Sequence, residues 1–144
     1  MRKNLKPEDL RDLLEGSTLA VLGTHMKDGH TLLSPVWHEY RDGGFTVVIL
    51  EDDVKSRHLK RNPMASVLVA EQSSPYRGIE IRGEATVSKP ADLLDTIRRV
   101  AIRYLGEERG NAYVETLGGV GLEEIRLEPG TLRAWDFKDE ELLT

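Results

Sequence analysis

Two glycine-containing turns, each lying between two apolar runs, constrain the fold of this chain most strongly. Asp28-Gly29 lies in the first turn and Asp42-Gly43-Gly44 in the second. Asp-Gly between apolar segments is typical of a tight hairpin between antiparallel strands. The sequence therefore predicts three consecutive antiparallel strands, over residues 17–26, 31–40 and 45–50.

Three more strands are expected further along the chain. They cover residues 64–71, 76–88 and 122–137, and the last is interrupted at Pro129-Gly130. Many short strands separated by turn signals are typical of a small antiparallel barrel. The first and third strands are apolar on both faces, so both faces need cover. One face can line the barrel interior, and the other needs a helix or a second subunit. We therefore predict a homodimer.

Four helical segments are expected around these strands. A short helix over residues 7–15 and a basic helix over 54–63 come first. The clearest helix covers residues 91–106, where apolar residues recur at helical spacing. Another short helix is expected over residues 110–117.

Composition limits the class of protein. The 144 residues fit a single domain, residues 1–144, and the net charge of −5 argues against nucleic-acid binding. The chain has no cysteine, which excludes disulfides and thiolate chemistry, and its four histidines lack convincing ligand spacing, so no metal site is predicted. No apolar run is long enough to span a membrane and the N-terminus does not resemble a signal peptide, so we expect a cytoplasmic protein.

The first candidate binding site is the basic segment at residues 54–63. A helix N-terminus attracts anions through its free N–H groups and partial positive charge, and Lys55 and Arg57 add full charges. The expected ligand is a phosphate group of a cofactor. The alternative is an ordinary capped surface helix, because Asp52 or Asp53 could accept the same amide hydrogen bonds.

The second candidate lies within the second predicted strand, at Ser34, Pro35, Val36 and Trp37. Proline inside a strand marks an edge or a bulge, where backbone groups outside the ladder can contact a ligand. Trp37 offers a flat apolar face beside it. The alternative is that Trp37 belongs to the core and that Pro35 forms a bulge without a ligand.

Several segments, taken in order, carry a family resemblance. They are residues 19–24, 27–29, 34–37, 55–59, 62–63, 75–77 and 81–83. Together they resemble the flavin-binding split-barrel family related to pyridoxamine 5′-phosphate oxidase, which includes small FMN- and deazaflavin (F420)-dependent oxidoreductases. The resemblance extends over residues 10–137. It implies a mainly β fold, a six-stranded antiparallel split β-barrel with flanking helices, and a homodimer with cofactor sites at its interface.

The resemblance also implies roles for individual residues. Lys55 and Arg57 match the positions that hold the cofactor phosphate, and His58 stands beside them where the family usually has asparagine. The backbone of residues 34–37 would lie along the flavin ring. A tryptophan near the C-terminus often lies close to this site in the family, which makes Trp135 a candidate.

The function implied is hydride transfer between bound F420 or FMN and a small unsaturated substrate. His38 and Tyr40 are the only nearby candidates for a general acid. Asp52 and Asp53 are a departure, because carboxylates repel phosphate. They leave open the alternative of a non-catalytic protein that binds flavin, deazaflavin or haem. The chain lacks the arginine-rich C-terminal segment of a true pyridoxamine phosphate oxidase, and that activity is not expected.

Overall fold

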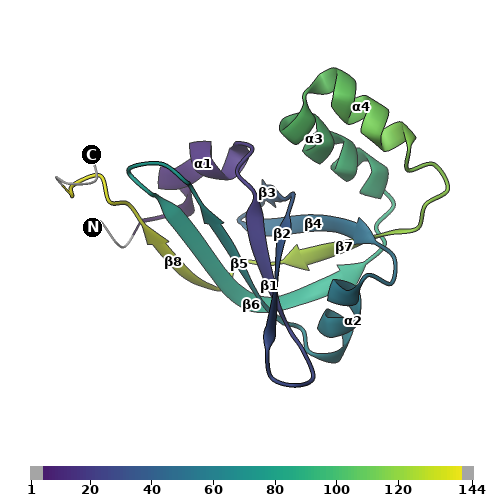
Figure 1. The fold of residues 1–144 in the computed structure, drawn as a ribbon, viewed down its shortest axis with the longest axis horizontal. Coiled ribbons are helices and arrows are strands. Elements are labelled where there is room, and N and C mark those ends of the chain that lie inside the picture. The colour runs from purple at the N-terminus through teal and green to yellow at the C-terminus, as the bar shows by residue number, and fades with distance from the viewer. Residues whose placement is uncertain (1–4, 141–144) are drawn as a thin grey trace.

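Eight antiparallel strands form one continuous sheet in the computed structural model, which describes residues 5–140 (Figure 1). The strand order is β2-β1-β5-β6-β7-β4-β3, and β8 pairs separately with β6. The strands are β1 (Ala20–His25), β2 (Thr31–Val36), β3 (Glu39–Arg41), β4 (Gly44–Leu50), β5 (Met64–Ala70), β6 (Gly78–Ser88), β7 (Leu122–Leu127) and β8 (Thr131–Trp135).

The mainly β split-barrel prediction is confirmed, but the predicted count of six strands is wrong. Residues 31–40 form two strands instead of one, because the ladder with β1 ends at Val36 and β3 pairs with β4. Residues 122–137 also form two strands, because the chain turns at Pro129-Gly130. β7 and β8 then pair with different stretches of β6.

The long strand β6 curls the sheet into a half-barrel. Its first seven residues, from Gly78 to Glu84, pair with β5, and its last four, from Ala85 to Ser88, pair with β7. One strand thus joins two halves of the sheet that face different ways (Figure 1). The interior is filled by apolar side chains that alternate along the strands, including Leu22, Val67, Ile81 and Ile125.

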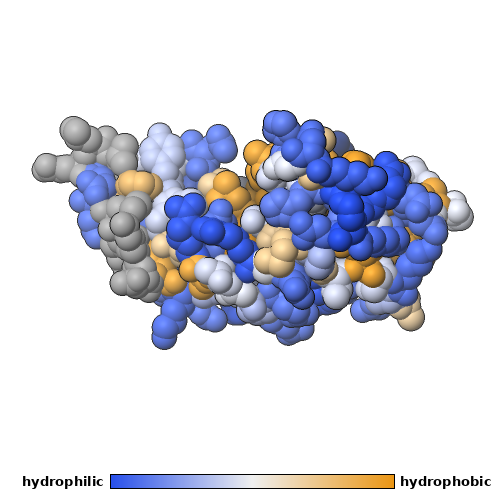
Figure 2. Space-filling view, turned by 90° about the horizontal axis from the view of Figure 1, so that it is seen from below, coloured by the Kyte–Doolittle hydropathy of each residue, from blue (hydrophilic) through white to orange (hydrophobic). Residues whose placement is uncertain are grey.

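The helices lie around this half-barrel. They are a 3₁₀ turn η1 (Pro7–Leu10), α1 (Arg11–Glu15), α2 (Val54–Arg61), α3 (Leu93–Leu105) and α4 (Glu107–Glu115). Within residues 5–140, none is long and apolar enough to cross a membrane. The face that lies below in Figure 1 carries apolar residues in separate groups among hydrophilic ones (Figure 2).

Helix α4 begins three residues earlier than the sequence predicts. Only Gly106, at φ +87°, separates it from α3, a conformation that glycine adopts at little steric cost. Gly110 lies inside α4, where an added Cβ would fall 2.6 Å from the backbone of Ile102. The missing side chain therefore lets α3 and α4 pack closely.

A second apolar cluster lies outside the half-barrel. Ile97, Val100 and Val114 of the helix pair α3–α4 pack near Val48 of β4 and near Trp37, which directly follows β2. This helix pair covers the outer face of β4, which is the third predicted strand. The strand is apolar on both faces, and helices supply the cover for its outer face.

Candidate cofactor site

Helix α2 begins at a cap formed by Asp53. The Asp53 carboxylate accepts a hydrogen bond of 2.9 Å from the backbone N–H of Lys55, and the same oxygen lies 3.0 Å from the Lys55 ammonium. Although burial alone raises the pKa of Asp53, the hydrogen bonds and charge of Lys55 hold it below its usual value. Asp53 thus takes the capping role that the sequence left open between Asp52 and Asp53.

A buried carboxylate, that of Glu123 on β7, fixes α2 against the sheet. One oxygen accepts hydrogen bonds from the Ser56 hydroxyl at 2.8 Å and the Asp52 backbone N–H at 3.3 Å, and the other lies 3.1 Å from the Lys60 ammonium. Burial alone raises the pKa of Glu123, but these bonds outweigh it and lower the pKa. Glu123 was not among the site residues predicted from the sequence. Its alternation with Ile125 and Leu127 was the available signal that it faces inward.

A pocket of about 390 Å³ lies between the end of β2, strand β4, the start of α2 and the helices α3 and α4. Its walls are mostly apolar, and of the residues that the structure describes only Asp53 and Lys55 bring a charge to the lining. It brings together four of the residues predicted from the sequence, namely Pro35, Val36, Trp37 and Lys55. We call it the cofactor pocket.

Trp37 forms a fixed aromatic wall of the cofactor pocket. Its ring stacks on that of Tyr104, with centroids 5.3 Å apart and planes within 7°, and the ring of Tyr113 meets its edge at 5.3 Å. Tyr104 is itself held, because its hydroxyl lies 2.9 Å from both His38 Nδ1 and the Thr18 carbonyl. Trp37 therefore presents a flat surface whose orientation is set by neighbouring rings.

His38 is buried behind this wall and does not line the pocket. Its Nε2 lies 3.3 Å from the Leu14 carbonyl, and its Nδ1 lies 2.9 Å from the Tyr104 hydroxyl, which donates to the Thr18 carbonyl. Burial, together with the nearby charge of Arg103, lowers the pKa of His38 to about 4. Because His38 is buried and its ring is neutral, it is better suited to supporting Tyr104 than to donating a proton to a ligand.

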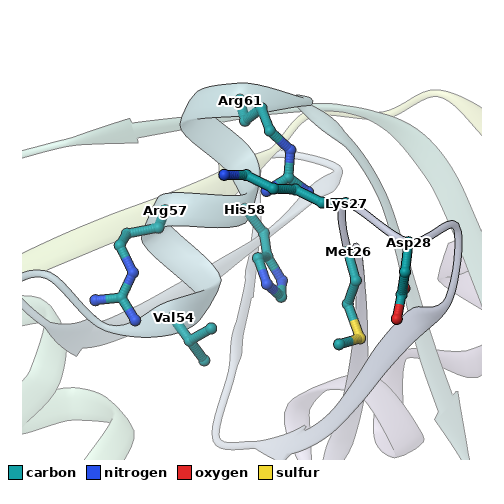
Figure 3. Close-up of a pocket in the computed structure, with 7 residues that line it drawn as sticks. All are labelled: Met26, Lys27, Asp28, Val54, Arg57, His58 and Arg61. Atoms are coloured by element: carbon teal, nitrogen blue, oxygen red, sulfur yellow. The ribbon is translucent and has the colours of Figure 1, made fainter.

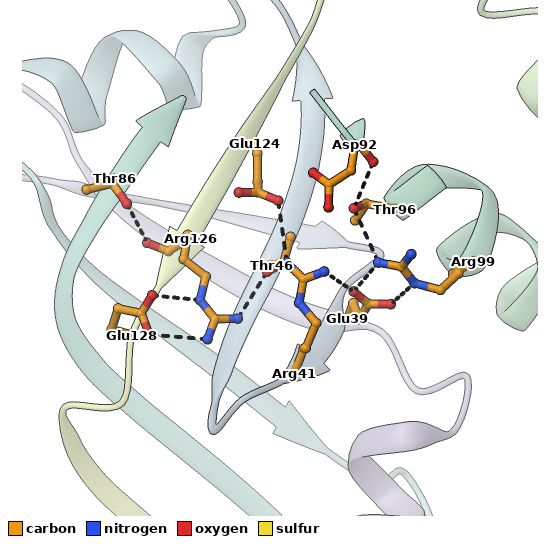
Figure 4. A network of polar contacts seen from close by, with 10 residues as sticks. All are labelled: Glu39, Arg41, Thr46, Thr86, Asp92, Thr96, Arg99, Glu124, Arg126 and Glu128. Carbon is orange, nitrogen blue, oxygen red and sulfur yellow. Dashed lines mark hydrogen bonds and ion pairs between the residues drawn. The ribbon is translucent and has the colours of Figure 1, made fainter. Parts of the chain in front are cut away.

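Helix α3 is fastened to the sheet by the polar network of Figure 4. Arg99 donates to both oxygens of the Glu39 carboxylate, at 2.8 and 3.1 Å. Burial raises the pKa of Glu39, but the Arg99 hydrogen bond and charge lower it below its usual value. Arg41 lies 3.5 Å from Glu39 and 3.9 Å from Glu124. The network thereby fixes the helix that supplies Ile97 to the pocket wall.

The other predicted site residues lie elsewhere. Arg57 and His58 line a separate pocket between α2 and the turn that joins β1 to β2 (Figure 3). Ser34 lies opposite Leu22 in the β1–β2 ladder and lines neither pocket. Trp135, on β8, also lines neither and lies against Gly78. Within residues 5–140, no group of three or more histidine or acidic side chains is arranged to hold a metal ion.

A half-barrel of antiparallel strands with flanking helices defines a split-barrel protein. The sequence profile of pyridoxamine 5′-phosphate oxidase matches residues 7–135, and the chain belongs to that family. The resemblance seen in the sequence is thereby confirmed. The comparison with curated protein sequences gives no significant match.

Solved structures share this fold. A conserved hypothetical protein from Mycobacterium tuberculosis is 22% identical with a TM-score of 0.76, covering 93% of this chain and 86% of its own. An F420 reductase is 20% identical with a TM-score of 0.66, covering 85% and 94%. The haem storage protein HutZ from Vibrio cholerae is 20% identical with a TM-score of 0.67, covering 92% and 94%. At these identities the similarity establishes the fold.

Proposed function

We propose that this protein binds F420 or FMN in the cofactor pocket and acts as an oxidoreductase on a small unsaturated substrate. The observation that carries the proposal is the convergence of Pro35, Val36, Trp37 and Lys55 on one pocket. These residues come from two segments that the sequence pattern singled out independently of each other.

The pocket suits a planar ring better than it suits a phosphate. Val48, Val100 and the held ring of Trp37 give it apolar walls, and a pocket of about 390 Å³ falls in the range of small-molecule sites. Lys55 is the one cation in the lining among residues 5–140, and its ammonium already lies 3.0 Å from Asp53. A phosphate would therefore have to displace the Asp53 carboxylate from Lys55.

In this proposal the cofactor supplies the hydride chemistry and the chain orients the cofactor and limits access to it. Lys55 would neutralise part of the phosphate charge through a charge-assisted hydrogen bond. Trp37 would lie against the ring, and the helix pair α3–α4 would keep water from one side of it. None of these roles requires a side chain of this protein to donate a proton.

We also propose a homodimer with the cofactor pocket at its interface. Strand β2 is at the edge of the sheet, and Leu33 and Pro35 lie on the same face of it. The Leu33 side chain is 66% exposed, and Pro35 also lines the cofactor pocket. A second copy that covered Leu33 would thus approach the pocket beside Pro35.

A second candidate function is cofactor or haem binding without catalysis. The specific observation that favours it is the ion pair between Asp53 and Lys55, which occupies the position proposed for the phosphate. The fold is also shared by the haem storage protein HutZ and by a haem-binding protein from Mycobacterium smegmatis.

A titration distinguishes the two functions. Purified protein is titrated with F420, FMN and haem while visible absorbance and cofactor fluorescence are recorded. We expect saturable binding of F420 or FMN, weakened about tenfold in Lys55→Gln by loss of one charged hydrogen bond. Lys138→Gln, a change of the same charge outside the pocket, is the control. If the protein binds neither F420 nor FMN, the proposal is contradicted. If it binds a cofactor but turns over no reductant, the second function is supported.

A further inference from the structure

Five rings in contact lead from the wall of the cofactor pocket to a partly exposed tyrosine on β3. Each ring touches the next, and the centroids of successive rings are 5.3, 6.4, 5.4 and 5.6 Å apart. In order, the rings are those of Trp37, Tyr104, His38, Phe45 and Tyr40. We call this group the ring series. It connects the pocket with a side chain at the other end of the second apolar strand pair, β3–β4.

The ring series does not reflect a high aromatic content. The protein has two tryptophans, two phenylalanines and four tyrosines, which together are only 6% of its sequence. Of these eight residues, four belong to the ring series and a fifth, Tyr113, meets the edge of Trp37 at 5.3 Å. They come from separate segments, namely β3, β4, α3, α4 and the residue after β2, so the fold brings them together.

The two ends of the ring series are side chains that lose an electron readily. Tryptophan and tyrosine are the most easily oxidised side chains of a protein without cysteine, and Trp37 stacks on Tyr104 with the ring planes within 7°. This geometry overlaps the two π systems. His38 and Phe45 are harder to oxidise, but their rings fill the space between Tyr104 and Tyr40, so an electron can tunnel across them.

A base lies beside Tyr104, which an oxidised tyrosine needs because it releases its phenolic proton. The Tyr104 hydroxyl lies 2.9 Å from His38 Nδ1. The hydroxyl donates to the Thr18 carbonyl, but a peptide carbonyl does not take up the proton. His38 Nε2 faces the Leu14 carbonyl, and the tautomer with its proton on Nε2 has a lone pair on Nδ1 that can accept from Tyr104.

The charge of Arg103 gives the ring series a direction. The Arg103 guanidinium lies 5.1 Å from the centroid of the Tyr104 ring and donates to the His38 carbonyl. A cation at this distance disfavours both loss of an electron from Tyr104 and a proton on His38. Near Tyr40, charges of both signs are present, namely those of Glu8, Glu15, Arg11 and Arg126. An oxidised Tyr104 is therefore driven to take an electron from Tyr40.

We propose that the ring series carries oxidation out of the cofactor pocket to Tyr40, one electron at a time. Trp37 gives one electron to a one-electron oxidant in the pocket, such as a light-excited oxidised flavin. Tyr104 then gives one electron to Trp37 and its phenolic proton to His38 Nδ1. Tyr40 gives one electron to Tyr104 and its own proton to water, while His38 returns its proton to Tyr104.

A small thiol in solution restores Tyr40 by giving it one hydrogen atom and becoming a thiyl radical. One electron thus passes from the thiol to the oxidant, and the protein is unchanged. The series would protect Trp37 from permanent oxidation. This protective role rests on the proposed function, whereas the electron transfer itself is tested without a cofactor.

Pulse radiolysis of the cofactor-free, full-length protein provides the test, because azide radicals oxidise tryptophan in preference to tyrosine. The background protein carries Trp135→Phe and Tyr113→Phe, so that Trp37 is the one tryptophan and Tyr113 cannot compete as an electron donor. We expect the absorption of the tryptophan radical to convert into that of a tyrosine radical, in a first-order process independent of protein concentration. A nitroso spin trap, located by peptide mass spectrometry, should then be found on Tyr40.

Tyr104→Phe keeps the stacked ring and removes the phenol, so the conversion should be lost and the trap should remain on Trp37. The matched control is Tyr76→Phe, which removes a phenol from an exposed tyrosine outside the ring series and should change neither readout. His38→Gln should slow the conversion about tenfold or more, because glutamine does not take up the proton. Circular dichroism checks that each variant is folded.

The proposal is overturned if Tyr104→Phe converts as fast as the background protein, or if Tyr76→Phe loses the conversion. Should Tyr104→Phe fail to fold, Tyr40→Phe decides, because the radical must then stay on Tyr104 and the trap must leave position 40. A trap on Tyr76 in the background protein also overturns the proposal. No cofactor is present in these experiments, so their outcome is separate from whether the protein binds F420 or FMN.

Discussion

The Asp53 carboxylate binds Lys55 twice, through the backbone N–H at 2.9 Å and the ammonium at 3.0 Å. One side chain thus occupies both the free amide and the positive charge that an anion would use at the start of α2. The Asp53 cap and a bound phosphate would therefore compete for the same two groups, the backbone N–H and the ammonium of Lys55. Replacing Asp53 tests which of them the protein uses.

Asp53→Asn should tighten binding of F420 or FMN about tenfold. Asparagine caps a helix about as well as aspartate, so α2 should persist, while the charge that repels phosphate is removed. Dissociation constants from fluorescence titration give the comparison. Asp52→Asn removes the same charge from the neighbouring exposed residue and should have a smaller effect. Unchanged affinity in Asp53→Asn would place the phosphate away from Lys55.

Glu123→Gln should destabilise the fold by about 1–3 kcal/mol. Glutamine keeps one acceptor for Ser56 but loses the charge that faces the Lys60 ammonium. Urea unfolding followed by circular dichroism measures the change. Glu84→Gln, on the exposed side of β6, should change stability by less than about 0.5 kcal/mol. Equal stability of the two variants would show that Glu123 does not anchor α2.

The order of helices and strands could be predicted from local signals, and the strand count could not. Asp28-Gly29 and Asp42-Gly43 specify hairpins through a few adjacent residues, and both turns occur where predicted. Whether residues 31–40 form one strand or two depends on where the partner strands end, which is a property of the whole sheet. The break after Val36 therefore has no local signal beyond Pro35.

The candidate site could be predicted only in part, for a related reason. Lys55 and Arg57 are two positions apart in the sequence, so they were predicted to act as one basic cluster. On a helix they point in different directions, and the structure puts them in different pockets. Glu123 contacts Ser56, and Tyr104 contacts Trp37, in each case across 67 residues of sequence. Local sequence patterns do not show contacts between such distant segments, so both residues were missed.

Gly110→Ala should destabilise the protein by about 1–3 kcal/mol, although alanine favours helices. The added Cβ would lie 2.6 Å from the N and Cα atoms of Ile102, so α3 and α4 would have to separate. Thermal unfolding measures the effect. Gly118→Ala is the control, because its Cβ would meet only the Glu115 carbonyl at an ordinary 3.7 Å. A stabilised Gly110→Ala variant would mean that the helices are not in close contact.

His38 should make the fold sensitive to acid above the range in which carboxylates titrate. Because its folded pKa is lowered to about 4, the unfolded chain binds a proton below pH 6.5 that the folded chain does not. Its contribution to stability is complete above pH 6.5 and is lost as the pH falls toward 4. Between pH 7 and pH 5 the expected loss is about 2 kcal/mol.

Urea unfolding of the wild type and of His38→Gln at pH 7 and pH 5 isolates this contribution. The glutamine side chain has both donors and an acceptor for the Leu14 carbonyl and the Tyr104 hydroxyl, which His38 contacts, but it does not titrate. The loss between the two pH values should therefore shrink by about 2 kcal/mol in His38→Gln. His30→Gln, at an exposed histidine, should keep the wild-type loss. If His38→Gln also keeps it, His38 is protonated in the fold, and its hydrogen bonds to Tyr104 and Leu14 differ from those described.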